Sequence, residues 1–223
     1  MSERFAIIGR GFEGEGDSIR IDWINSIERD NLGWEPLKTL GSLDQSAVGT
    51  DRTILISDAG EVYAFGKDCF SKSKSEVQET KLITTPQRVK SLTEIFVVQA
   101  TIGNYFTAVL SREGRVYTLS WGSDERLGND TDHSCSLPQP LLGALENIPV
   151  VQIAAGFCYL LALAIQPTGM SVYSVGCGLG GKLGHGCDDC ETQPRLIEQF
   201  GFLNIEPVMV SAGTLCVDDP FCF

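Results

Sequence analysis

A repeat of about 55 residues constrains the fold of this 223-residue chain more than any other feature of its sequence. A glycine follows a short apolar run four times, at spacings of 54, 53 and 57 residues: Gly49, Gly103, Gly156 and Gly213. A Val-Tyr pair also recurs, with its tyrosines at Tyr63, Tyr117 and Tyr173. A period near 50 residues is typical of propellers and repeat arrays. Short strands bounded by glycine favour a propeller blade over a pair of helices.

The third copy shows the unit most clearly. Three apolar runs, Val150–Ala155, Tyr159–Ile165 and Ser171–Val175, are separated by Gly156 and by a Pro-Thr-Gly turn. A glycine tract that includes Gly181 and Gly184 then follows. Runs of this length between glycine and proline turns predict β-strands.

These motifs resemble a known repeat. Gly103–Thr107 followed by Gly114–Tyr117 resembles the repeat of the regulator of chromosome condensation family, and so does Val151–Gly156 followed by Val172-Tyr173 and Gly181–Gly186. The resemblance covers residues 44 to 213 and implies a part of a seven-bladed β-propeller. We therefore expect an all-β fold, an incomplete β-propeller of about three full four-stranded blades plus partial blades at both ends.

The repeat period divides the chain into five segments. We expect blades at 41–95, 96–148 and 149–205, and the start of a truncated further blade at 206–223. Residues 1–40 are interpreted as an eroded partial blade or an N-terminal extension, and the alternative is a short helix over Asp17–Leu32. Because propellers typically have about four to eight blades, we expect a truncated isoform or gene product. Such a chain is expected to be marginally stable and to self-associate or pair with a second half-propeller.

Composition narrows the classes of partner and the location. The net charge of −12 and the lack of a long Lys/Arg cluster argue against nucleic acid as the ligand. The N-terminus lacks an apolar signal run, and the longest apolar run has seven residues, so we expect a cytoplasmic or nuclear protein that is neither secreted nor membrane-bound. In that setting the eight cysteines are expected to be mostly reduced thiols.

The glycine tract also satisfies two phosphate-binding patterns. Gly176–Gly181 fits G-x-G-x-x-G, and with Lys182 it fits the start of a P-loop. Both motifs need a helix whose N–H groups point at the phosphate. Leu183 stands where a P-loop has Ser or Thr, and Gly184 and Gly186 oppose a helix. We therefore interpret the tract as a repeat turn and expect no cofactor.

A zinc site and catalysis have weaker support than a structural interpretation. His185, Cys187 and Cys190 lie close in sequence, but a structural zinc needs four ligands and the other copies lack these residues. Neither histidine, His133 or His185, lies in a hydrolase motif. We expect no catalytic and no metal site, while metal binding by His185, Cys187 and Cys190 stays open.

Two functions follow from the resemblance. The first is a non-catalytic propeller module that binds another protein through its blade loops. The alternative is guanine-nucleotide exchange on a small Ran-like GTPase, which the resemblance implies for the family's exchange factor. Family members often carry histidine three residues after the repeat glycine, where this chain has Arg52, Phe106 and Tyr159. We expect these loop residues to contact a partner: Asp124, Glu125, Arg126, Lys182, His185, Asp188 and Asp189.

The blade interpretation also predicts a core. Near-continuous apolar strands covered by neighbouring blades bury both faces. In the third copy we expect these residues to be largely buried: Val151, Ile153, Ala155, Leu161, Leu163, Val172 and Val175. We also expect Gly103, Gly156 and Gly213 to occupy equivalent strand ends.

Overall fold

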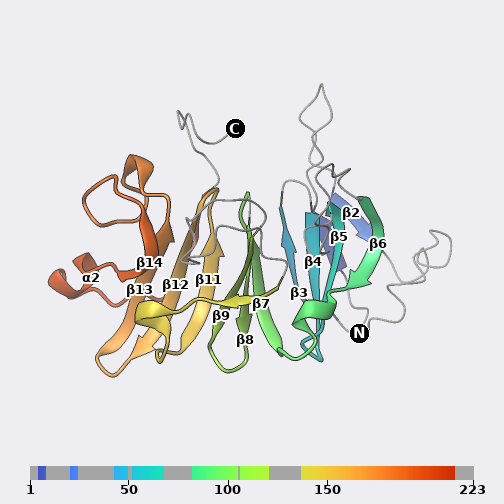
Figure 1. Ribbon diagram of the computed structural model, residues 1–223, viewed down its shortest axis with the longest axis horizontal. Coiled ribbons are helices and arrows are strands. Elements are labelled where there is room, and N and C mark those ends of the chain that lie inside the picture. Colours follow the sequence, from blue (N-terminus) through green and yellow to red (C-terminus); the bar gives the residue numbers. More distant parts are fainter. Residues whose placement is uncertain are drawn as a thin grey trace.

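The computed structural model describes residues 5–8, 21–24, 43–49, 52–67, 82–104, 106–120 and 137–213. Within them lie three four-stranded antiparallel sheets, which stand side by side in chain order in Figure 1. The all-β propeller architecture with three four-stranded blades is thereby confirmed. Residues 68–81 and 121–136 lie outside the described residues.

Each blade is an up-and-down meander of sequential strands. Blade 1 consists of β3 (Leu43–Val48), β4 (Arg52–Ser57), β5 (Val62–Lys67) and β6 (Leu82–Arg88). Blade 2 consists of β7 (Val97–Ile102), β8 (Phe106–Ser111), β9 (Val116–Ser120) and β10 (Gln139–Pro140). Blade 3 consists of β11 (Val150–Ala155), β12 (Tyr159–Gln166), β13 (Gly169–Gly176) and β14 (Glu191–Leu196).

Short helical turns follow the blades. They are η2 (Lys90–Leu92), η3 (Gly143–Leu145) and α2 (Gln199–Phe202), while η4 (Leu179–Gly181) lies between β13 and β14. No helix among the described residues is long and apolar enough to cross a membrane.

The N-terminal segment contains a small sheet of its own. Strand β1 (Phe5–Ile8) pairs antiparallel with β2 (Ile21–Ile24). The alternative of a helix over Asp17–Leu32 is therefore wrong. Its apolar residues Ile21, Trp23 and Ile24 have no helical period, and the first two alternate with Asp22 as in a strand.

The core lies between the blades. One buried cluster joins blade 1 to blade 2 through residues such as Ile54, Ile56, Val97 and Val109. The next joins blade 2 to blade 3: Phe106, Ala108, Leu110, Val116, Leu141, Leu145, Val150, Ile153, Leu160, Ala162, Ala164, Tyr173 and Val175. Central strands are therefore covered on both faces, which explains their near-continuous apolar sequences.

The predicted core of blade 3 holds with one exception. Ile153, Leu163, Val172 and Val175 are buried, and Ala155 and Leu161 are partly buried. Val151 was expected to be buried and is instead 44% exposed. The pairing of β11 with β12 shifts between Val150 and Gln152, so Val151 is the extra residue of a bulge. Val98 occupies the same bulge in blade 2 and packs against the cluster shared with blade 3, so the exposure of Val151 reflects the lack of a further blade among the described residues.

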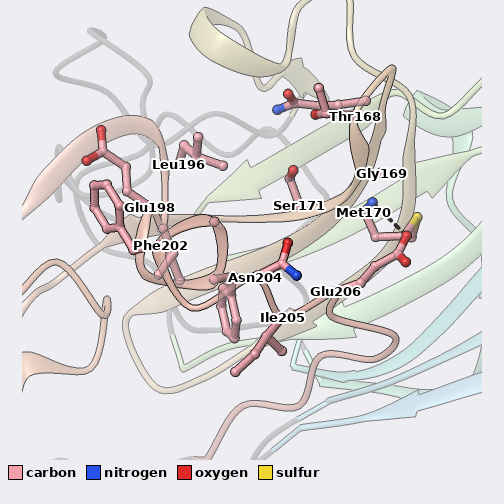
Figure 2. Close-up of a pocket in the computed structure, with 14 residues that line it drawn as sticks. Thr168, Gly169, Met170, Ser171, Leu196, Glu198, Phe202, Asn204, Ile205 and Glu206 are labelled. Carbon is pink, nitrogen blue, oxygen red and sulfur yellow. Dashed lines mark hydrogen bonds between the residues drawn. The ribbon is translucent and has the colours of Figure 1, made fainter.

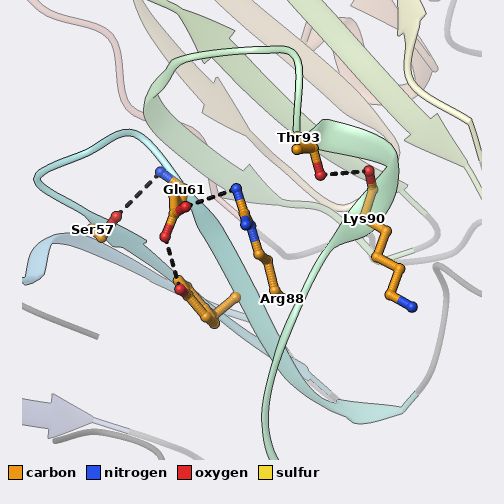
Figure 3. A network of polar contacts seen from close by, with 6 residues as sticks. Ser57, Glu61, Arg88, Lys90 and Thr93 are labelled. Atoms are coloured by element: carbon orange, nitrogen blue, oxygen red, sulfur yellow. Dashed lines mark hydrogen bonds and ion pairs between the residues drawn. The ribbon is translucent and has the colours of Figure 1, made fainter. Parts of the chain in front are cut away.

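Polar contacts around the hairpin between β4 and β5 link three strands at one end of blade 1 (Figure 3). The Ser57 hydroxyl accepts a hydrogen bond from the Glu61 backbone N–H at 3.2 Å. The Glu61 carboxylate forms an ion pair with Arg88 of β6 at 2.7 Å and accepts a hydrogen bond from the Tyr63 hydroxyl at 2.8 Å. Burial and the contact with Glu61 raise the pKa of Tyr63, which keeps its hydroxyl protonated. Strands β4, β5 and β6 are thus linked at one end of the blade.

The fourth copy of the repeat begins but is not a strand. Residues Val208–Gly213 were expected to form the first strand of a further blade, yet they form no ladder. The preceding Pro207 lacks an N–H, and among the described residues no second strand follows to pair with the segment. The segment nevertheless lies against blade 3, where Val210 is buried with Leu163 and Val172.

Candidate functional site

The predicted partner-binding residues that the structure describes lie on one connection, between β13 and β14 of blade 3. Asp188 and Asp189 are exposed, and Lys182 and His185 are partly buried. Asp124, Glu125 and Arg126, which were expected to join them from the previous blade, lie outside the described residues. The connection therefore exposes two adjacent carboxylates, while Lys182 and His185 lie nearer the blade.

His185 fastens this loop to the blade. Its Nε2 lies 2.8 Å from the Ser174 hydroxyl, which itself donates to the carbonyl of Leu183 at 2.8 Å. Because the single hydroxyl proton is used on Leu183, the serine oxygen accepts from a protonated Nε2. Burial lowers the pKa of His185, as does nearby Arg195. His185 is therefore a neutral structural residue at neutral pH, rather than an exposed cation.

Glycines shape the same loop. Gly181 and Gly184 have φ of 68° and 77°, and their N–H groups close successive turns on the carbonyls of Gly178 and Gly181. Side chains other than glycine rarely adopt this left-handed conformation. A three-residue turn, η4, stands where a phosphate-binding motif requires a helix. The tract is therefore a repeat turn, as its sequence context predicts.

The remaining reactive or charged side chains of the loop are those of Lys182 and two cysteines. The Lys182 ammonium lies 5.9 Å from the centroid of the Tyr159 ring, a cation–π distance. Cys187 is partly buried and Cys190 exposed. Within the part of the chain that the structure describes, no three His, Cys, Asp or Glu side chains are grouped as metal ligands.

The repeat glycines occupy one structural position. The N–H groups of Gly49, Gly103 and Gly156 each donate to the carbonyl of the residue three further on, at 2.9 to 3.0 Å. A Cβ added to Gly156 would lie 1.9 Å from Cε1 of Tyr159, and one added to Gly103 would lie 2.2 Å from Cε1 of Phe106. At these two positions the following aromatic ring fills the space of a side chain. Gly213 was expected at an equivalent strand end, and this is wrong: it ends a segment that forms no strand, and the space around it is open.

The residue three positions after the repeat glycine joins successive blades. The Arg52 guanidinium of blade 1 reaches the carbonyls of Gly103 and Phe106 in blade 2, at 3.4 and 3.3 Å. The Tyr159 hydroxyl accepts from the Gly213 N–H at 3.3 Å. These two side chains, each three residues after a repeat glycine, link neighbouring turns.

Sequence reasoning missed a second link between blades. The Gln99 side chain donates to the carbonyl of Ile153 at 3.0 Å and accepts from its N–H at 2.8 Å. Gln152 makes the same pair of bonds with Val210, at 3.2 and 3.0 Å. The signal was present, since glutamine stands four residues before the repeat glycine at positions 45, 99 and 152, and Met209 replaces it in the fourth copy.

The outer face of blade 3 carries a pocket of about 710 Å³ (Figure 2). The turn between β12 and β13, the end of β14, helix α2 and the chain up to Glu206 form its walls. Met170, Phe200, Phe202 and Ile205 supply apolar surface, and the Met170 N–H donates to the Glu206 carboxylate at 3.2 Å. We name this surface, together with Val208–Gly213, the open face of blade 3.

Comparison with known proteins agrees with this geometry. The sequence model described as "Regulator of chromosome condensation (RCC1) repeat" matches residues 113–163 and 171–216. The chain is 26% identical over 178 residues to the human E3 ubiquitin-protein ligase HERC2, covering 77% of this chain and 4% of the ligase. It is 33% identical over 144 residues to the human probable E3 ubiquitin-protein ligase HERC3, covering 65% of this chain and 13% of that protein.

A solved structure shares the fold. The crystal structure of Prp20p from Saccharomyces cerevisiae superposes with a TM-score of 0.62 at 18% identity, covering 88% of this chain and 50% of that one. This chain thus spans half the length of the yeast protein and a much smaller part of the two ligases.

Proposed function

Because this chain carries repeats of the regulator of chromosome condensation family, we propose that it is a non-catalytic propeller module that binds another protein through the loop between β13 and β14. One observation carries the proposal. The exposed carboxylates of Asp188 and Asp189 stand on a loop that His185 links to the blade and that the turn glycines shape. A pre-shaped charged loop loses little conformational freedom on binding, which favours affinity.

The chemistry of the loop indicates a basic partner. Asp188 and Asp189 are adjacent and exposed, and the chain as a whole has a net charge of −12. Electrostatic complementarity mainly raises the association rate and excludes wrong partners. The partner surface is therefore expected to carry Lys or Arg, and binding should weaken as the salt concentration rises.

The experiment is affinity capture with the purified, tagged chain, followed by a binding measurement with each captured protein after purification. Asp188→Lys together with Asp189→Lys should abolish the interaction. The control is compared with each single loop variant: Glu113→Lys makes the same charge change as Asp188→Lys or Asp189→Lys, on the exposed hairpin between β8 and β9 at the opposite end of the strands. Equal binding by wild type, loop variant and control would overturn the proposal.

Nucleotide exchange on a Ran-like GTPase is the second candidate function. The yeast protein Prp20p is described by its binding properties to Gsp1p and histones. Here Arg52 and Tyr159, at the family's histidine positions, make contacts between blades instead. We expect this chain not to accelerate the release of labelled GDP from a Ran-like GTPase. Acceleration in proportion to its concentration would favour exchange over the scaffold.

A further inference from the structure

One apolar repeat position is treated differently in the third blade. Leu92, Leu145 and Phe202 each end the helical turn that follows a blade, and each lies eleven residues before a repeat glycine. Leu92 and Leu145 are 3% and 6% exposed, whereas Phe202 is 75% exposed. The sequence thus keeps an apolar residue at a position where the third blade leaves it uncovered.

The two complete interfaces show what such a residue packs with. Leu92 lies in one cluster with Val109 and Leu119 of the next blade, and Tyr117 packs against that cluster. Leu145 lies in one cluster with Ala162, Tyr173 and Val175 of the next blade. In both clusters the next blade contributes residues from its first three strands, and its third strand offers a tyrosine and an aliphatic residue two positions apart.

At the open face of blade 3 this cover is incomplete. The buried cluster there comprises Leu163, Val172 and Val210, of which only Val210 comes from beyond the blade. The pocket opens beside it, with Phe202 and Ile205 at its wall (Figure 2). Ile205 is 52% exposed, whereas its repeat equivalents Ile95 and Ile148 are partly buried and pack against the clusters of the first two interfaces.

The backbone beside the pocket is also arranged for a strand. The Gln152 side chain bonds the backbone of Val210 in the same way that the Gln99 side chain bonds the backbone of Ile153 in β11. Strand β11 uses its other edge to pair with β12. The corresponding edge of residues 208–212 has no strand partner among the described residues, and Val208 and Met209 beside it are 85% and 71% exposed. An edge of this kind readily accepts an added strand.

We infer that the open face of blade 3 is a docking site for an antiparallel β-hairpin of another polypeptide. One strand of this hairpin pairs with residues 208–212, and the next places an aromatic and an aliphatic side chain, two positions apart, over Phe202 and Ile205. The inference rests on the proposed binding function and names a second surface for it. It extends an interface that the chain already builds twice.

The C-terminal tail of this chain and a second copy of the chain fit the open face of blade 3 less well. The tail of the chain would place Asp219 six residues after Gly213, where the other blades have Val109 and Ala162, both at most 2% exposed. A buried, unpaired carboxylate is strongly unfavourable because its charge loses its hydration. In a second copy stacked head to tail, the residue equivalent to Val109 and Ala162 is Leu55 of blade 1. Leu55 is only 1% exposed, so it is already covered within its own chain.

The test uses a synthetic peptide with the sequence of residues 157–197, labelled and titrated into the full-length chain. It supplies the strands of blade 3 that carry Ala162, Tyr173 and Val175. Binding is expected, and a peptide with Ala162→Asp and Val175→Asp should bind at least about tenfold more weakly, because both changed side chains face the apolar surface. Absence of binding, or equal binding by the two peptides, would overturn the inference.

Matched variants of the chain locate the site. Ile205→Asp, in the pocket, should weaken peptide binding at least about tenfold. Leu142→Asp, at 51% exposure in blade 2, is the control with the same degree of exposure as Ile205 and should bind like wild type. Asp188→Lys should also leave peptide binding unchanged, so that failure of this site and failure of the loop proposal are separate results.

A fusion keeps the test decisive when the free peptide is unfolded. Residues 157–197 are attached after Gly213 in place of the tail, which should raise the melting temperature, and Ile205→Asp should remove the gain. A fusion without this gain would overturn the inference, as the absence of peptide binding would. Sedimentation of the unmodified chain is the last arm, because a dimer that Ile205→Asp dissociates would assign the face to a second copy instead.

Discussion

Gln152 holds Val210 through two hydrogen bonds, from its side-chain nitrogen to the valine carbonyl at 3.2 Å and from the valine N–H to its side-chain oxygen at 3.0 Å. Gln99 makes the same two bonds with Ile153, one interface earlier. A single side-chain amide therefore replaces a backbone ladder between blades that share no sheet. The same device places residues 208–213 against blade 3 although they form no strand.

Gln152→Ala should loosen this segment. The substitution removes both bonds and leaves the partly buried backbone groups of Val210 without these partners, a cost of about 1–3 kcal/mol. The substitution is expected to raise the amide hydrogen exchange rate at Val210 by a larger factor than it raises the global unfolding rate. Gln45→Ala changes the same repeat position where the side chain is exposed and is the control. Unchanged exchange at Val210 in Gln152→Ala would contradict the bridging role.

Leu163→Ala should destabilise the chain by about 2–5 kcal/mol, because this side chain of β12 is only 2% exposed and packs with Val172 and Val210. Urea unfolding followed by circular dichroism measures the change. Val151→Ala, in the bulge of the same blade, should alter stability by no more than about 0.5 kcal/mol. A large effect at Val151 would contradict the placement of that residue outside the core.

Gly156→Ala should destabilise by overpacking. The new methyl group would lie 1.9 Å from the Tyr159 ring, so the ring or the turn must shift, at a cost of about 1–3 kcal/mol. Gly201→Ala is the control, because nothing lies within 4 Å of its Cβ position in α2. Thermal melting of both variants decides, and a loss confined to Gly201→Ala would refute the close packing at Gly156.

Stability should fall on acidification through His185. Its pKa is lowered in the folded protein, chiefly by burial, so the unfolded chain binds the proton more readily. The unfolding free energy is therefore highest above the unfolded pKa and declines as the pH falls below it, until the folded form is also protonated. The decline begins near the ordinary pKa of about 6.5.

His185→Gln should flatten this part of the pH profile while keeping a hydrogen-bond donor near Ser174. Urea unfolding at several pH values between 8 and 5 measures the difference between the two proteins. His133 and the carboxylates are common to both, so their contributions cancel. Parallel profiles for wild type and variant would show that His185 does not contribute.

The sequence determined the architecture through local rules. The spacing of Gly103 and Gly156, with strands between them, fixes the length of a blade, because each glycine is the one residue that fits beside the aromatic ring three positions on. Sequence context likewise distinguishes the tract around Gly181 from a phosphate loop. A helix over Asp17–Leu32 was the wrong alternative because its apolar residues lack a helical period and include the strand Ile21–Ile24.

Tertiary structure decided what no local pattern could. Val151 stands in the same bulge as Val98, yet only Val98 has a neighbouring blade among the described residues to pack against. Phe202 stands at the same repeat position as Leu92 and Leu145, but its exposure depends on whether a neighbouring blade covers it. Residues 208–213 have the sequence of a strand and need a partner strand to become one. Local sequence sets which side chains are apolar and where turns occur, whereas burial and strand formation depend on segments distant in the chain.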